Sequence, residues 1–188
     1  MPLKLRTVPN LYTPQLSDEP LSLSQLQVYA DDIQSEVERT RPEYGPLCRL
    51  QRAAGNRINE MFESDRWTFP TTTAVQIRPQ KGNAVRIVSL FDLGFQSVEA
   101  MRPVLADMDR LPKGQYERAF ASAVKVAGLW RLYEGGFLHP STHFFRHLKI
   151  KLLKAQNFSP EYIATWIGEK KVQNLDYYFN SQYFAEIR

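Results

Sequence analysis

Two short segments rich in β-branched residues limit the kind of fold that this chain can adopt. Residues 74–79 (A-V-Q-I-R-P) and 84–90 (A-V-R-I-V-S-L) alternate apolar and polar positions, and only Q-K-G-N separates them. This pattern predicts a β-hairpin. The other periodic segments have the spacing of helices. The sequence therefore predicts an α+β fold that is mainly helical and carries a small antiparallel sheet.

Helical periodicity covers most of the remaining chain. We predict helices over residues 22–38 (capped by Ser22 or Ser24), 46–62, 98–111, 115–127, 141–156, 160–167 and 174–179. Gly55 inside the second of these indicates close packing, because glycine costs a helix about 1 kcal/mol relative to alanine. Residues 1–20 contain four prolines and no period, so we expect an extended N-terminal arm followed by one domain over residues 21–188.

Composition places the chain among globular proteins. Of its residues 43% are hydrophobic and 23% are charged, and no apolar run has the length that crosses a bilayer. Cys48 is the only cysteine, which excludes an internal disulfide and favours a reducing compartment. We therefore expect a cytoplasmic or nucleoid-associated protein, which could come from a virus or a mobile element. One cysteine and three histidines disfavour a structural metal, and we expect no cofactor.

Positive charge is concentrated in the part of the chain that follows residue 43. Residues 1–43 carry four Lys or Arg against seven Asp or Glu, whereas the remainder carries twenty against thirteen. This imbalance favours an anionic partner for the larger part, with nucleic acid before membrane.

The helix expected over residues 141–156 carries the strongest candidate site. His143, Arg146 and His147 are spaced i, i+3 and i+4, so they share one face. The lysines that follow meet no acidic residue before Glu161. Guanidinium and imidazole donors without a nearby carboxylate suit a phosphate. The alternative is a basic helix whose charges are simply solvated.

Three further features fit a phosphate site. Arg57 has Glu60 three residues on, where a carboxylate can orient its guanidinium. Lys81 lies at the tip of the expected hairpin, and its flexible stem could reach a neighbouring groove. Tyr177 and Tyr178 lie in the last expected helix. Each feature also has a structural interpretation: a buried ion pair, an ordinary turn lysine and packed tyrosines.

Together these features resemble the catalytic domain of the tyrosine recombinase (phage integrase) family. Four segments carry the resemblance, in the family's order. Residues 53–60 (A-A-G-N-R-I-N-E) resemble the arginine box T-G-L-R-x-S-E, and residues 81–90 (K-G-N-A-V-R-I-V-S-L) resemble the lysine hairpin K-G-N-K-x-R-x-V-P-L. Residues 143–147 (H-F-F-R-H) resemble the H-x-L-R-H box, and residues 166–168 (W-I-G) with Tyr178 resemble the L-G-H motif and its tyrosine. The spacing between these segments also fits, and the resemblance runs from Leu21 to Tyr178.

The resemblance implies that the chain cleaves and rejoins DNA in site-specific recombination, without a metal. Tyr178 would attack a phosphodiester and form a 3′-phosphotyrosine, leaving a free 5′-hydroxyl. Arg57 and Arg146 would stabilise the charge that develops on the phosphate. Lys81 would protonate the departing 5′ oxygen, and His143 would assist proton transfer or hold the phosphate. The family's tyrosine lies nine residues after the L-G-H histidine, which selects Tyr178 here.

The chain departs from the family in two ways. Glu169 stands where the family has histidine or tryptophan, and a carboxylate there would repel a phosphate unless it were protonated or turned away. Nothing before Leu21 is long enough to be the family's core-binding domain, so we expect either an excised catalytic domain or a naturally short member.

Four functional hypotheses follow. The first is a recombinase, the second a recombinase fold that has lost cleavage through Glu169 and binds DNA or a partner recombinase, the third a type IB topoisomerase-like enzyme, and the fourth a helical protein whose motifs coincide by chance. Double-stranded DNA is the expected partner, and other protomers are possible because relatives act as tetramers. We expect further contacts to the DNA backbone from Arg78, Arg86, Lys149 and Lys151. The alternative is that these are solvated surface charges.

Overall fold

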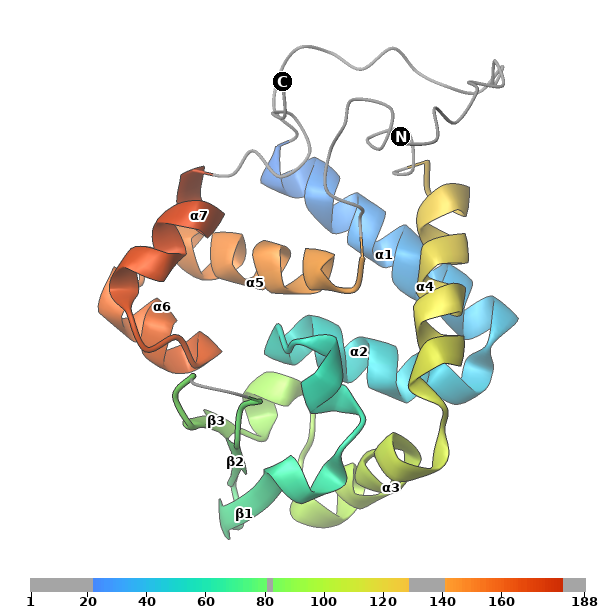
Figure 1. Ribbon diagram of the computed structural model, residues 1–188, viewed down its shortest axis with the longest axis horizontal. Helices are drawn as coiled ribbons and strands as arrows, with labels where there is room; N and C mark the ends of the chain where they lie inside the picture. The colour runs from blue at the N-terminus through green and yellow to red at the C-terminus, as the bar shows by residue number, and fades with distance from the viewer. Residues whose placement is uncertain (1–21, 81–82, 129–140, 181–188) are drawn as a thin grey trace, which may run out of the picture.

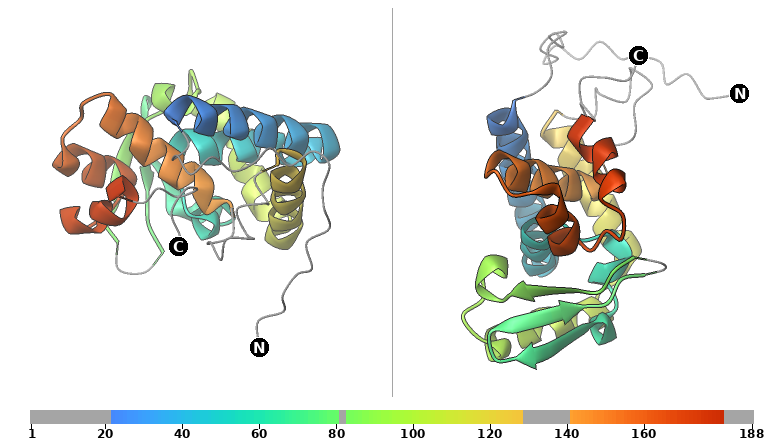
Figure 2. Two further views of the ribbon diagram at one scale, coloured as in Figure 1. Left: turned by 90° about the horizontal axis from the view of Figure 1, so that it is seen from above. Right: turned by 90° about the vertical axis from the view of Figure 1, so that its left-hand side faces the viewer.

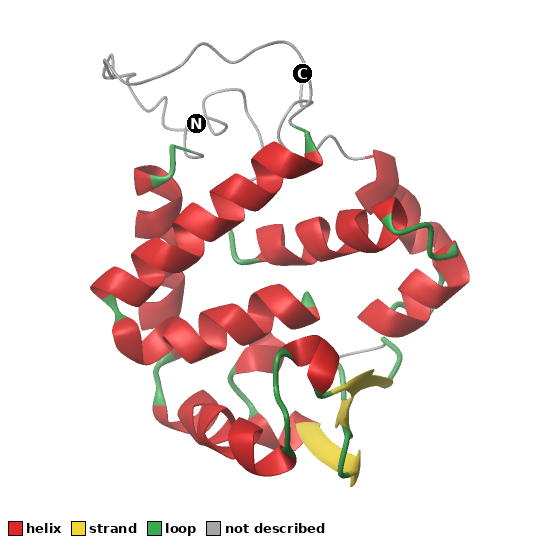
Figure 3. Ribbon diagram, turned by 180° about the vertical axis from the view of Figure 1, so that it is seen from behind, coloured by secondary structure: helices red, strands yellow, loops and turns green. Residues whose placement is uncertain are grey.

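The chain folds into a bundle of helices with one small sheet at its edge (Figures 1 and 3). A computed structural model describes residues 22–80, 83–128 and 141–180, so the expected arm over residues 1–20 lies outside the described part. The mainly helical α+β prediction is confirmed. The α-helices are α1 (Leu23–Thr40), α2 (Gly45–Ala54), α3 (Val98–Arg110), α4 (Lys113–Val126), α5 (His143–Ala155), α6 (Pro160–Ile167) and α7 (Leu175–Asn180). The 3-10 helices are η1 (Pro42–Tyr44), η2 (Ile58–Met61), η3 (Ser64–Arg66), η4 (Phe91–Leu93) and η6 (Val172–Asn174), and the strands are β1 (Trp67–Thr71), β2 (Ala74–Ile77) and β3 (Arg86–Ser89).

α1 begins at a capping residue that the sequence predicts. The Ser22 Oγ accepts a hydrogen bond from the Gln25 amide at 3.2 Å, and the Gln25 Oε1 accepts one from the Ser22 amide at 2.7 Å. This reciprocal capping box satisfies two amides that the helix itself leaves unpaired. The buried side of α1 packs against α2, α4 and α5. Its buried residues are Leu26, Ala30, Ile33 and Val37.

α2 ends earlier than its apolar pattern predicts. The helix stops just before Gly55, which caps it with a left-handed φ of 62° that glycine adopts without a Cβ penalty. The predicted continuation of the helix through Gly55 is therefore wrong, and Arg57 lies at the start of η2 instead. The predicted close packing is confirmed, because a Cβ on Gly55 would lie 2.8 Å from Ile167 Cδ1 and 3.0 Å from Lys149 Cβ.

The predicted hairpin is confirmed, and a third strand extends it. β2 and β3 pair antiparallel from Ala74 opposite Ser89 to Ile77 opposite Arg86. β1 pairs antiparallel with β2, which gives the order β1-β2-β3. The sequence pattern does not predict β1, because Pro70 interrupts the alternation of apolar and polar residues. Proline is tolerated there because β1 is an edge strand and does not need every amide for pairing.

The sheet lies against the end of the helical layer that carries α6 (Figure 2, right). The Ala84 amide donates to the Gly168 carbonyl oxygen at 3.1 Å, so the segment entering β3 is tied to the turn after α6. A Cβ on Gly168 would lie 3.0 Å from the Ala84 carbonyl oxygen, and this glycine also has a positive φ of 80°. The hairpin and the turn after α6 thus approach each other as closely as their backbones allow.

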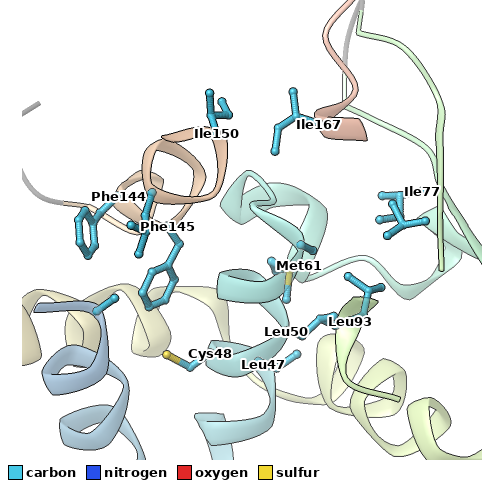
Figure 4. Close-up of a cluster of buried hydrophobic side chains, with 14 of the residues drawn as sticks. Leu47, Cys48, Leu50, Met61, Ile77, Leu93, Phe144, Phe145, Ile150 and Ile167 are labelled. Carbon is cyan, nitrogen blue, oxygen red and sulfur yellow. The ribbon is translucent and has the colours of Figure 1, made fainter. Parts of the chain in front are cut away.

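The hydrophobic core extends from the contact between α5 and α2 to the sheet (Figure 4). Phe145 of α5 meets Phe120 of α4 edge to face, with 5.2 Å between ring centroids. Cys48 of α2 is fully buried, and burial raises the pKa of its thiol to about 12, so it acts as a small apolar side chain. Further buried members of this core are Leu47, Leu50, Met61, Ile77, Leu93, Phe144, Ile150 and Ile167.

None of the helices in the described ranges has both the length and the apolar content to cross a bilayer.

Candidate functional site

Four separate segments bring the candidate residues together: the turn after α2, the first half of α5, the turn after α6, and α7. α5 lies next to α2, and α6 and α7 pack against α5 (Figure 1). The turn after α2 supplies Arg57, α5 supplies His143 and Arg146, the turn after α6 supplies Glu169, and α7 supplies Tyr178.

The basic face of α5 points into the protein rather than into solvent. Arg146 is 0% exposed and His147 is 1% exposed, so the alternative of a solvated basic helix is wrong for this face. The Ser141 Oγ accepts a hydrogen bond from the His143 amide at 3.3 Å at the start of the helix. A fully buried guanidinium is stable only if its donors are paired, which directs attention to the partners of Arg146.

Arg146 joins two helix ends to the site. Its Nη1 donates to the carbonyl oxygens of Gly55 at 3.1 Å and Ile167 at 3.2 Å, which lie at the C-terminal ends of α2 and α6. Its Nε donates to the Tyr178 hydroxyl at 3.3 Å, and its Nη2 donates to Glu169 Oε1 at 2.6 Å. Carbonyls at the end of a helix lack partners within that helix and carry partial negative charge, so a buried cation suits them.

Arg57 approaches the same carboxylate from the more exposed side. Its side chain is 28% exposed, and its Nη2 lies 2.6 Å from Glu169 Oε1. Glu60 fixes the turn, because its Oε2 accepts from the Arg57 amide at 3.2 Å and its Oε1 lies 3.9 Å from Arg57 Nη1. The indole of Trp67 in turn donates to the Glu60 carbonyl oxygen at 2.7 Å. The predicted pairing of Glu60 with Arg57 is confirmed.

Glu169 is the centre of the charged cluster. One carboxylate oxygen, Oε1, accepts hydrogen bonds from both Arg57 and Arg146, and Oε2 accepts one from Asn174 Nδ2 at 3.3 Å. Burial raises the pKa of this carboxyl, but the hydrogen bond and charge of Arg146, together with Arg57 and Asn174, outweigh it and lower the pKa below its ordinary value. Glu169 is therefore ionised at neutral pH and turned inward, so neither protonation nor an outward turn relieves the repulsion that a phosphate would meet there.

Tyr178 places its hydroxyl between a guanidinium and an imidazole. The hydroxyl oxygen lies 3.3 Å from His143 Nε2 and 3.3 Å from Arg146 Nε, and the side chain is only 6% exposed. Burial and the nearby Arg146 and Arg57 cations lower the pKa of His143 to about 4, so its ring is neutral at pH 7. A neutral imidazole can accept the tyrosine proton. The side chain of Tyr177 lies outside the described part.

His147 packs beneath the tyrosine. Its ring centroid lies 4.6 Å from that of Tyr178 and 5.2 Å from that of His143. Burial, followed by the charges of neighbouring groups, lowers the pKa of His147 to about 2, so this ring is also neutral at pH 7. It supports the aromatic face of Tyr178 without adding charge.

Arg86 holds the same two helix ends from the side of the sheet. Its Nη1 donates to the carbonyl oxygens of Ala54 at 2.9 Å and Trp166 at 3.0 Å, and its guanidinium lies 5.6 Å from the Trp166 ring centroid. Burial lowers the pKa of Arg86 to about 9, which leaves it charged at neutral pH. Because the residue is only 3% exposed, the prediction that it contacts the DNA backbone is wrong.

The three other predicted DNA-backbone contacts differ in exposure. Arg78 is exposed, and its Nη2 lies 3.2 Å from Asp65 Oδ2. Lys149 and Lys151 are half-buried, and the Lys149 Nζ lies 4.5 Å from the Trp166 ring centroid. Lys81, the predicted proton donor to the 5′ oxygen, lies outside the described residues, so its role stays a prediction.

Asn174 is the site residue that sequence reasoning missed. It lies in η6 and contacts the buried carboxylate through its amide, but a lone asparagine in a short polar stretch gives no signal of such a role. Within residues 22–80, 83–128 and 141–180, no three His, Cys, Asp or Glu side chains are grouped as they would be around a metal ion.

Neither a known family model nor a curated protein sequence matches the chain. Solved structures do match. A lambda integrase dimer bound to a COC′ core site superposes with a TM-score of 0.62 at 17% identity, covering 90% of this chain and 62% of that one. The XerH site-specific recombinase bound to its difH substrate, in a pre-cleavage complex, gives a TM-score of 0.57 at 15% identity, covering 85% and 49% of the two chains. Its post-cleavage complex with a palindromic difH substrate gives 0.56 at 16% identity.

These similarities establish the fold. At such low identity the likeness concerns the path of the chain, which is that of a tyrosine recombinase catalytic domain, as the sequence motifs predict. The chain spans 62% of the lambda integrase chain and about half of the XerH chain.

Proposed function

We propose that this domain cleaves and rejoins DNA through a covalent bond between Tyr178 and the 3′ phosphate. The observation that carries the proposal is the position of the Tyr178 hydroxyl, 3.3 Å from a neutral imidazole nitrogen and 3.3 Å from a guanidinium that also faces an anion. A nucleophile, a base and a charge-stabilising group within hydrogen-bond reach of one another are what nucleophilic attack on a phosphodiester requires.

The proposed step follows from these groups. The Tyr178 oxygen attacks phosphorus while His143 Nε2 accepts its proton, and the bond from phosphorus to the 5′ oxygen breaks. Arg57 and Arg146 stabilise the negative charge on the non-bridging oxygens. The 5′ oxygen leaves as a hydroxyl after it gains a proton, for which Lys81 is the proposed donor. Because one phosphodiester is exchanged for another, the reverse attack by a 5′-hydroxyl rejoins the strand.

Duplex DNA is the proposed substrate, and the neighbouring structures with bound DNA support this assignment. The exposed Arg78 and the half-buried Lys149 and Lys151 would add contacts to the DNA backbone. Site-specific recombination, in which several protomers act on paired sites, is the biological process that we propose for this activity.

A covalent trapping assay tests the proposal. A nicked duplex built on the DNA that flanks the gene loses a short 5′-hydroxyl strand on cleavage, so the protein stays attached to the DNA under denaturing conditions. We expect an adduct with the wild-type chain and with Tyr177→Phe, and none with Tyr178→Phe, and mass spectrometry should locate the DNA on Tyr178. An adduct that persists in Tyr178→Phe would overturn the proposed nucleophile.

The second candidate function is DNA binding without cleavage. The ionised Glu169 carboxylate fills the place between Arg57 and Arg146 where a phosphate would bind, and this contact favours an inactive site. Salt-sensitive DNA binding without any adduct from the wild-type chain would support this candidate. If loss of the phosphate donor is the reason, Glu169→His should restore an adduct.

A further inference from the structure

A single carboxylate oxygen occupies the centre of the arginine pair. Glu169 Oε1 lies 2.6 Å from Arg57 Nη2 and 2.6 Å from Arg146 Nη2. Distances this short are typical of charge-assisted hydrogen bonds. An oxygen of any other anion that used the same two donors would have to take the place of Oε1.

The carboxylate and the nucleophile share a guanidinium. Arg146 donates to Glu169 through Nη2 and to the Tyr178 hydroxyl through Nε, and these two nitrogens are bonded to the same carbon. The carboxylate oxygen therefore lies beside the tyrosine oxygen on one planar group. That is where a non-bridging oxygen of a phosphate would lie while the Tyr178 oxygen attacks its phosphorus.

The charges match as well as the positions. An ionised carboxylate and a phosphodiester each carry one negative charge, so either one leaves the arginine pair equally neutralised. Because Arg146 and the Glu169 side chain are almost completely buried, a pair of guanidiniums without an anion would be costly. Exchange of one anion for the other avoids that state.

The backbone is held by hydrogen bonds at Glu169 and at the residue before it, so the exchange can proceed by side-chain rotation. Its amide donates to the Ala164 carbonyl oxygen at 2.8 Å, and the preceding residue, Gly168, accepts from Ala84. Asn174, which holds the second carboxylate oxygen at a longer 3.3 Å, is exposed. The carboxylate can leave past Asn174 while Arg57, which is partly exposed, receives the incoming anion.

We propose that Glu169 is a built-in competitor of the substrate phosphate, which holds the arginine pair in the free protein and must leave before a phosphodiester can bind. The inference rests on the proposed function for the identity of the substrate, but it makes a separate claim about anion binding. It predicts that removal of the negative charge at position 169 opens the site to free phosphate.

Inorganic phosphate is the probe. Its binding is measured as the difference between the thermal unfolding midpoint in phosphate and the midpoint in chloride at equal ionic strength. We expect the Glu169→Gln variant to bind phosphate at least about tenfold more tightly than the wild-type chain, and so to show a concentration-dependent rise in midpoint that the wild type lacks. Glu161→Gln, which removes an exposed glutamate from α6, is the matched control and should behave as the wild type. Adding Arg57→Gln to Glu169→Gln should abolish the response, because it removes one of the two donors.

Two results would overturn the inference: a wild-type response as large as that of Glu169→Gln, or a folded Glu169→Gln variant that does not respond to phosphate. If Glu169→Gln does not fold, Glu169→Asp replaces it, because this variant keeps the charge but shortens the side chain. We expect an intermediate response to phosphate from Glu169→Asp, and the absence of any response would count against the inference. The trapping assay remains independent, because failure to form a DNA adduct would reject the proposed function while leaving the phosphate response to be judged by itself.

Discussion

Two buried arginines tie the same pair of helix ends together, one from the side of the sheet and one from the side of α5. Arg86 donates to carbonyls near the C-terminal ends of α2 and α6, at Ala54 and Trp166, and Arg146 donates to those one residue further on, at Gly55 and Ile167. The two differ in what the rest of the guanidinium does. Arg146 uses Nε and Nη2 on Tyr178 and Glu169, whereas Arg86 Nη2 has no hydrogen-bond partner within the described residues.

The difference shows how a structural contact can also serve chemistry. Both arginines meet the need of two helix C-terminal ends for hydrogen-bond donors. Only Arg146 faces Tyr178, the proposed nucleophile. The predictions below separate these two tasks.

The largest effect is expected from Arg146→Met. This change leaves the buried Glu169 carboxylate with one guanidinium fewer and removes both carbonyl contacts, so the free energy of unfolding should fall by about 3–5 kcal/mol. The DNA adduct should decrease at least ~100-fold, because a donor to the phosphate is lost. Urea unfolding and the trapping assay measure the two losses. A change in stability without a change in adduct yield would remove Arg146 from the proposed chemistry.

Arg86→Met should lower stability by a smaller amount and spare the chemistry. It removes two hydrogen bonds from a charged donor, but it also removes a buried charge whose desolvation is unfavourable, so we expect a loss of about 1–3 kcal/mol. Adduct formation per folded molecule should stay close to that of the wild type. A loss of adduct as large as in Arg146→Met would mean that the two arginines do not divide the tasks.

Gly55→Ala should disturb both arginines at once. The added Cβ must accept a φ of 62° and lies 2.8 Å from Ile167 Cδ1 and 3.0 Å from Lys149 Cβ, so the Ile167 side chain has to rotate and the end of α2 has to shift relative to α5. We expect a loss of about 1–3 kcal/mol in urea unfolding. Gly94 also has a positive φ, of 86°, but open space around its Cβ position, so Gly94→Ala is the control for backbone strain alone and should cost less.

Acid should weaken the side of the protein that carries Arg146. The pKa of His147 is lowered from 6.5 to about 2 and that of His143 to about 4, so the unfolded chain binds protons on these rings before the folded chain does. Their contribution to stability is complete above pH 6.5 and is lost as pH falls below it, approaching ~1.4 kcal/mol per pH unit for His147.

Chemical unfolding at pH 7.5, 6.5 and 5.5 measures this slope. In the double variant His143→Gln, His147→Gln, the free energy of unfolding should depend less steeply on pH. The remaining histidine, His139, lies outside the described part and still contributes. An unchanged slope in the double variant would show that the two rings do not cause the acid sensitivity.

Periodicity and short motifs were enough to predict the hairpin, most helices and the meeting of Arg57, His143, Arg146 and Tyr178. They were not enough for contacts that depend on tertiary packing. Arg86 looks like a surface residue of an alternating strand, and the approach of the ends of α2 and α6 buries it. A glycine after an apolar position is a common signal for the end of a helix, but the apolar pattern continues beyond Gly55 and predicts a longer helix.

Glu169 shows the same limit. Its position in the sequence indicates that a carboxylate enters the site, but whether it faces the arginines depends on the turn after α6 and on Asn174. Side-chain direction at such a turn is set by residues that are distant in sequence, such as Ala84 of the hairpin.

The double use of Arg146 affects how related sequences should be compared. Under the proposed function, a relative that no longer cut DNA would still need this arginine to keep α2 and α6 together, so its presence alone does not identify an active enzyme. Arg57 is 28% exposed and does not join the two helix ends, so it would be lost at lower cost once catalysis is no longer needed. A survey that seeks working enzymes among distant relatives should therefore give more weight to Arg57 than to Arg146.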